Sequence, residues 1–162
     1  MNCGPGSSDK QKNVIKNLKV VANQIKTESK KIVLLNQVHS SKFKYISKHS
    51  NLNIKFEGDA LITNKRNTPI AVLTADCAPI LLYDRNKEMI AAIHAGWKGA
   101  YKGIITKVIK FMIKKGCSPK SITAAIGPCI SNKNYQVRED FIKKFIKKDK
   151  KNIIFFKKTK NK

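Results

Sequence analysis

Acidic residues are scarce in this sequence. The 162 residues include 10 Asp and Glu against 34 Lys and Arg, which gives a formal net charge of +24. Such a surplus is typical of proteins that bind nucleic acid or anionic membranes. The cations, however, are scattered along the whole chain, and Arg stands only at positions 66, 85 and 138. Because base recognition favours Arg, a composition biased toward Lys, Ile and Asn explains the charge better, and a nucleic-acid-binding protein remains an alternative.

Long apolar runs are also absent, since Lys interrupts each one before it reaches the roughly 20 residues that cross a bilayer. The opening segment, MNCGPGSSDK, lacks the apolar core of a secretory signal. The cysteines, at positions 3, 77, 117 and 129, show no CxxC spacing. We therefore expect a cytoplasmic protein with reduced thiols and no membrane partner.

Apolar residues recur at helical spacing in three segments. The first covers 14–25, with Ser8 or Asp9 as a candidate cap. The second, at 101–112, carries the cleanest apolar stripe and has Gly116 as a natural stop. The third is a basic segment at 137–148. The sequence thus predicts three helices.

Strand-forming residues dominate much of the remainder. The segment KIVLLNQVH has the apolar run of a buried strand, and DRNK is a turn between two later strands. Strands are predicted at 31–39, 43–46, 59–63, 70–74, 80–83, 89–94, 122–126 and 153–156. No internal repeat or long linker appears, so we expect one strand-rich mixed domain of the α/β (α+β) class with packed helices over 1–162.

His39, Cys77 and His94 each lie at or just after the end of a predicted strand, where catalytic groups are commonly placed. Two imidazoles and a thiolate suit zinc and leave a fourth position open. The spacings of 38 and 17 residues form no local zinc signature. A Cys-His nucleophile and base, or three buried groups without chemistry, therefore remain open interpretations.

Asp76 stands next to Cys77 and is a candidate to orient a ligand histidine or to take a proton, although a turn or capping role fits equally. The glycines of HAGWKG and IGPC let backbone approach a ligand, and amides there can bind an anion such as phosphate. Both are predictions of a site at the ends of these strands.

Five motifs occur in one order: LNQVHS at 35–40, GDALIT at 58–63, TADCAPILLYD at 74–84, AAIHAGWKG at 91–99 and AAIGPCI at 124–130. Together they closely resemble the family long described as multicopper polyphenol oxidase or laccase, which includes purine nucleoside phosphorylases and the peptidoglycan editing factor. The resemblance implies layered mixed β-sheets flanked by helices, and one zinc ion held by His39, Cys77 and His94. With three histidines in the chain, several copper centres are not expected.

The activity that the resemblance implies is phosphorolysis of adenosine, inosine and methylthioadenosine, together with deamination of adenosine. The partners would be a purine nucleoside and phosphate, and a zinc-bound water would attack during deamination. Cys77, His94 and Asp76 are then the expected catalytic residues. Cleavage of an amide bond in a peptidoglycan precursor is the alternative activity.

The chain also departs from the family pattern. Members usually begin with a further strand region, carrying an Arg and paired glycines, before the Asn-x-Gly segment. They also continue past the FFKK segment to a late stretch rich in Arg and aromatic residues. Neither piece is present here. We therefore expect a fold that is incomplete at both ends, and an inactive, truncated remnant is one further alternative.

Overall fold

The computed structural model describes residues 1–52, 54 and 56–157. Its Cα positions divide into two compact units, residues 1–129 and 130–162. The expectation of a single domain stays a prediction.

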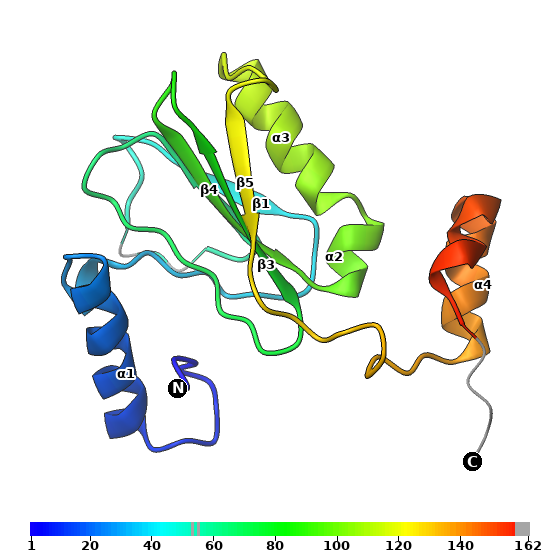
Figure 1. Ribbon diagram of the computed structural model, residues 1–162. Helices are drawn as coiled ribbons and strands as arrows, with labels where there is room; N and C mark the ends of the chain where they lie inside the picture. Colours follow the sequence, from blue (N-terminus) through cyan, green and yellow to red (C-terminus); the bar gives the residue numbers. More distant parts are fainter. Residues whose placement is uncertain (53, 55, 158–162) are drawn as a thin grey trace. The chain divides into compact units, whose positions relative to one another are not determined.

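The first unit is built on one mixed sheet of five strands in the order β1-β2-β4-β3-β5 (Figure 1). The first pair is parallel and the other three pairs are antiparallel. The strands are β1 (Phe43–Ile46), β2 (Ala60–Thr63), β3 (Ala78–Asp84), β4 (Met89–Ala95) and β5 (Ile122–Ile126). The predicted mixed α/β class is confirmed, and the strands form one sheet.

A tight hairpin joins β3 to β4. The strands pair from Ala78 opposite Ala95 to Asp84 opposite Met89. At the closed end, the Asp84 carboxylate accepts a hydrogen bond from the backbone N–H of Lys87 at 2.8 Å, which stabilises the predicted turn. The open end of the hairpin carries Cys77 and His94.

One face of the sheet is covered by α3 (Ile104–Lys114), as Figure 1 shows. Its inward residues Ile104, Val108 and Met112 are fully buried against a cluster that includes Ile62, Ile80, Leu82, Met89 and Ile93. The predicted apolar stripe is therefore a core helix. It begins later than expected because Gly103, with φ of +76°, separates it from the short α2 (Trp97–Tyr101).

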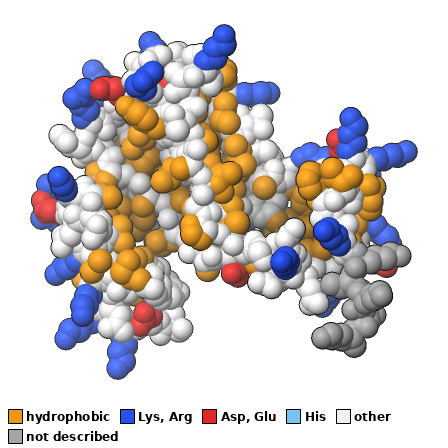
Figure 2. Space-filling model, viewed as in Figure 1, with side chains coloured by type: hydrophobic (Ala, Val, Ile, Leu, Met, Phe, Trp, Pro, Cys, Tyr) orange, Lys and Arg blue, Asp and Glu red, His pale blue; other side chains and the backbone are white. Residues whose placement is uncertain are grey.

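The opposite face is covered only in part. Leu61 points to this side and packs with Val33, Leu35 and Ile46, while α1 (Gln11–Gln24) buries Val14 and Ala22. Farther along the same face, Leu81 and Tyr83 remain about half exposed, at 55% and 45%. Figure 2 shows hydrophobic side chains at the surface over the sheet.

The helix α1 does not use the predicted caps. Its N-cap is Lys10, with no side-chain hydrogen bond to the helix backbone. Asp9 accepts a hydrogen bond from the side chain of Asn13 at 3.0 Å instead. The capping prediction was wrong because Asp9 lies one position too early in the chain.

Two strands predicted in the first unit were wrong. The segment 31–39 contains the end of a 3₁₀ turn, η1 (Ser29–Lys31), and two isolated bridges, Val33 to Ile70 and Asn36 to Glu57. The segment 70–74 has only the first of these bridges. Between these two segments, the side-chain amide of Gln37 makes the hydrogen bonds that backbone groups would make in a β-ladder. It donates to the Leu73 carbonyl at 2.8 Å and accepts from the Leu73 N–H at 2.7 Å.

The second unit contains α4 (Glu139–Lys148) and a 3₁₀ helix, η2 (Lys150–Phe155). The helix α4 confirms the third predicted helix. The strand predicted at 153–156 was wrong, because η2 extends to Phe155. Asp149 caps this 3₁₀ helix by accepting a hydrogen bond from the Lys151 N–H at 2.9 Å. Phe141, Phe145 and Phe156 pack together within this unit. In the described residues of both units, we find no helix of the length and apolarity that a membrane span requires.

Candidate metal centre

The three predicted ligands meet at one end of the sheet. His94 lies near the end of β4, opposite Pro79 in the register, and Cys77 directly precedes β3. His39 stands in the loop that leads to β1, with a left-handed backbone φ of +54°. Antiparallel pairing places the end of β4 and the start of β3 at the same end of the sheet.

One ligand atom from each of these residues lies within 4.8 Å of the other two. Cys77 Sγ is 3.7 Å from His39 Nε2, and the two imidazole rings meet edge to face with centroids 4.7 Å apart. His94 is buried, Cys77 is half-buried and His39 is exposed. The cluster therefore opens to solvent on the His39 side, and its two imidazoles and one thiol match the donors that zinc prefers.

Gly96 makes this close packing possible. A Cβ atom at this position would lie 2.8 Å from His39 Cδ2 and 3.0 Å from Cys77 Sγ, which is closer than van der Waals contact allows. A Cβ at Gly99 would similarly lie 2.6 Å from the carbonyl oxygen of Ser40. The two glycines of the HAGWKG motif thus leave room for the side chains of His39 and Cys77 and for the backbone of the loop at Ser40.

Asp59 is a functional candidate that the sequence did not single out. Its side chain is fully buried at the start of β2 and lies 2.8 Å from Nδ1 of His94. It also accepts hydrogen bonds from the backbone N–H groups of His39 and Ser40 and from the Ser40 hydroxyl. A carboxylate leading into a strand of otherwise buried residues, GDALIT, is the signal that points to it.

Asp76 does not contact a ligand histidine, as a carboxylate that orients such a ligand would. It is exposed, and the carboxylate that contacts His94 is that of Asp59. Asp76 acts on the cluster through its charge. Burial raises the pKa of the Cys77 thiol above its ordinary value, and the charges of Asp76 and Asp59 raise this pKa further.

Asp59 itself is held in its ionised form. Its burial opposes ionisation, but the hydrogen bonds from His94, from Ser40 and from the His39 backbone outweigh this and keep the pKa of Asp59 below its ordinary value. The site therefore combines a buried anion with a thiol that resists ionisation on its own. A bound cation would favour the thiolate.

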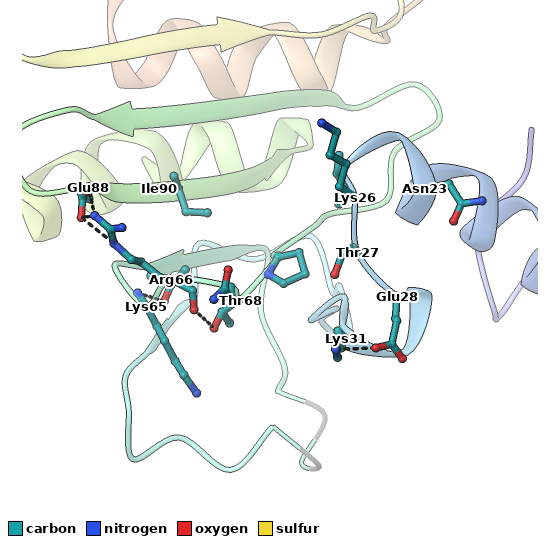
Figure 3. A pocket seen from close by; sticks show the side chains of 14 residues that line it. Asn23, Lys26, Thr27, Glu28, Lys31, Lys65, Arg66, Thr68, Glu88 and Ile90 are labelled. Atoms are coloured by element: carbon teal, nitrogen blue, oxygen red, sulfur yellow. Dashed lines mark hydrogen bonds and ion pairs between the residues drawn. The ribbon is translucent and has the colours of Figure 1, made fainter.

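A pocket of about 930 Å³ lies away from these three residues, at the other ends of β2 and β4 (Figure 3). Thr63 and Ile90 form part of its wall. Arg66 reaches Glu88 with a shortest distance of 2.6 Å, and Lys31 lies 2.6 Å from Glu28. Two of its cations are thus balanced by carboxylates, and the pocket lacks the ligand set found at His94.

The sequence matches the family model described as multi-copper polyphenol oxidoreductase laccase over residues 1–162. This chain belongs to that family. The copper in the family's description does not fit the three histidines of the chain, because several copper centres need many more.

Several relatives of this chain are named purine nucleoside phosphorylase and not laccase. Purine nucleoside phosphorylase RP494 of Rickettsia prowazekii is 36% identical over 143 residues, which are 88% of this chain and 57% of that protein. Purine nucleoside phosphorylase YlmD of Bacillus subtilis is 32% identical over 148 residues, covering 85% of this chain and 52% of the relative. The chain thus spans just over half the length of these relatives.

Solved structures agree with the fold. The Bacillus licheniformis hypothetical protein YfiH matches with a TM-score of 0.81 and 30% identity, over 88% of this chain and 57% of that one. The Neisseria meningitidis protein NMB0706 matches with a TM-score of 0.78 and 28% identity, over 94% and 60% of the two chains. The solved structures therefore support the same fold for this chain that the family match indicates.

Proposed function

We propose that this chain is a zinc-dependent enzyme of purine nucleoside metabolism that cleaves purine nucleosides with phosphate. The observation that carries the proposal is the convergence of His39, Cys77 and His94, whose ligand atoms all lie within 4.8 Å of one another. Relatives that are named purine nucleoside phosphorylase support the choice of substrate. Adenosine, inosine and methylthioadenosine are the nucleosides to be tested first.

The residues present fit zinc. Two imidazoles and one thiol are the donors of open, catalytic zinc sites, and three protein ligands leave a position for a substrate or water. The raised pKa of Cys77 disfavours a role as a free nucleophile, since reactive cysteines are found where neighbouring groups lower the pKa. When bound, zinc would supply Lewis acidity at the open side of the cluster.

The chain's own residues then have separate roles. His39, Cys77 and His94 hold the metal, and His94 is fixed through its contact with Asp59. Asp76 is exposed beside Cys77, where its carboxylate can take or return a proton during the reaction. Deamination of adenosine at the same centre is part of the proposal. The free cysteines support a reducing, cytoplasmic location.

The first test compares the parent chain with Cys77→Ala and with the control Cys129→Ala, which removes an exposed thiol outside the cluster. We expect the parent and the control to copurify with zinc and to release purine base from adenosine in the presence of phosphate. Cys77→Ala should lose both properties. A parent without zinc, or a Cys77→Ala variant with parental turnover, would contradict the mechanism.

The same assay distinguishes the alternative substrate. A muropeptide is incubated beside adenosine and phosphate, with zinc-loaded parent protein in both reactions. Release of free base from adenosine supports the nucleoside proposal. Cleavage of the muropeptide amide bond, with adenosine left intact, would replace it with an amidase.

A further inference from the structure

Four hydrogen-bonding groups converge on the Asp59 carboxylate, which has no exposed surface, and three of them are donors whatever the tautomer of His94. One oxygen, Oδ1, lies 3.0 Å from the backbone nitrogen of His39 and 2.8 Å from Nδ1 of His94. The other, Oδ2, accepts from the backbone N–H of Ser40 and from its hydroxyl, the latter at 2.7 Å. Each oxygen therefore serves two partners.

This arrangement determines the tautomer of His94. The backbone N–H groups of His39 and Ser40 can only donate, and the Ser40 hydroxyl donates as well, so both carboxylate oxygens are placed as acceptors. Nδ1 of His94 therefore carries a hydrogen and donates it to Asp59. Nε2 keeps its lone pair, which is the state in which an imidazole binds a metal.

The same carboxylate holds the backbone of a second ligand. His39 has a φ of +54°, a left-handed conformation that few residues other than Gly adopt. The consecutive N–H groups of His39 and Ser40 both point to Asp59, which stabilises this turn. The Asp59 carbonyl also accepts from the His94 N–H at 2.7 Å, so the residue is joined to both ligand segments.

We propose that Asp59 is the positioning residue of the metal centre, because it sets the tautomer of His94 and the loop conformation of His39 together. The inference rests on the metal site of the proposed function. Asn has nearly the same shape but replaces one acceptor oxygen with an NH₂ donor. In Asp59→Asn, either the His39 and His94 pair or the two Ser40 donors must therefore face another donor.

The first experiment reads the tautomer without any metal. The ¹⁵N chemical shifts of the His94 ring are measured by NMR in the metal-free parent and in Asp59→Asn at a pH where the ring is neutral. We expect the Nδ1–H form in the parent and a shift toward the Nε2–H form in the variant. An Nε2–H ring in the parent, or the same tautomer in both proteins, overturns the inference whether or not zinc binds.

The second experiment measures zinc affinity by competition with a chelator. Loss of such a partner typically weakens metal binding by about 10- to 100-fold, and we expect this for Asp59→Asn. The control is Asp84→Asn, which removes another fully buried carboxylate at the far end of the β3-β4 hairpin. This variant should lose stability and keep the parental zinc affinity.

Ser40→Ala provides a milder variant in case Asp59→Asn does not fold. It removes one donor to Oδ2 and keeps the carboxylate, so zinc affinity should fall less, and Ser40→Thr should restore it. Parental affinity in Asp59→Asn or in Ser40→Ala, or an equal loss in Asp84→Asn, overturns the positioning role. A parent that binds no zinc overturns the proposed function, while the tautomer measurement still decides the role of Asp59 at His94.

Discussion

Gly96 is the residue at which the packing of the candidate metal centre is tightest. Its backbone φ of −67° suits any residue, so only the side chain is excluded. A Cβ would lie 2.8 Å from His39 and 3.0 Å from Cys77. Since both neighbours are proposed ligands, either one must move to make room.

We therefore expect Gly96→Ala to weaken zinc binding by roughly 5- to 150-fold, which corresponds to the about 1–3 kcal/mol that overpacking typically costs. Gly6→Ala is the matched control, because no atom lies within 4 Å of a Cβ at that position. Chelator competition on both variants makes the comparison. Unchanged affinity in Gly96→Ala would show that the contacts at Gly96 do not control the ligand geometry.

At this scale the sequence pointed to some residues and not to others. His39, Cys77 and His94 could be chosen because a metal-binding side chain at a strand end is visible in the residue order. The glycines of HAGWKG were singled out for the approach of a ligand, whereas Gly96 makes room for His39 and Cys77, and Asp59 was not singled out. Their roles depend on which loop folds over which strand, and a pattern of residue types carries little of that information.

At the scale of elements, Asp84 connects the β3-β4 turn to the residues before β5. It accepts hydrogen bonds from the Ser121 hydroxyl and from the Lys87 N–H. The hydrogen bond from Ser121 is the largest influence on the pKa of Asp84 and lowers it, together with backbone N–H groups, although burial opposes ionisation. The carboxylate is therefore more acidic in the folded protein than in the unfolded chain.

Because the pKa of Asp84 is lower in the folded state, its contribution to stability is complete above the ordinary carboxyl pKa of about 4 and is lost as the pH falls through the lower folded value. Ser121→Ala should be less stable than the parent at pH 7, and the difference should shrink on acidification below pH of about 4. Urea unfolding between pH 7 and pH 3 measures it, with the exposed Ser131→Ala as control. A difference that stays constant over this range would rule out the carboxylate as its source.

The elements that could be predicted are those with a local pattern. The stripe of α3 and the short apolar strands on either side of the DRNK turn are visible in their own residues. The segment 31–39 has an equally apolar run, but it forms only two isolated bridges, each to a different segment, at Ile70 and at Glu57. Whether such a run forms a β-ladder depends on the segment beside it. Here the Gln37 side chain makes hydrogen bonds to the Leu73 backbone, and no ladder forms between these two segments.

At the scale of the whole molecule, the mixed class follows from strands and helices that the sequence displays, whereas strand order does not. The parallel pairing of β1 with β2 and the insertion of β4 between β2 and β3 arise from long-range contacts. Likewise, the +24 charge comes from Lys and Arg scattered along the chain, and none of these residues is among the three candidate ligands His39, Cys77 and His94.

The chain spans just over half the length of its named relatives, yet all three proposed ligands lie within the unit formed by residues 1–129. The site can therefore be tested on this chain alone. The activity requires the nucleoside assay described above, but metal binding requires only that these residues hold their geometry.

The most direct measurement is X-ray absorption at the zinc edge on the purified, zinc-loaded chain. The account predicts one sulfur neighbour at about 2.3 Å and two imidazole nitrogens at about 2.0–2.1 Å, with a light atom in the remaining position. Cys77→Ala should remove the sulfur signal. A zinc environment without sulfur in the parent, or one that Cys77→Ala leaves unchanged, would contradict the metal centre of His39, Cys77 and His94.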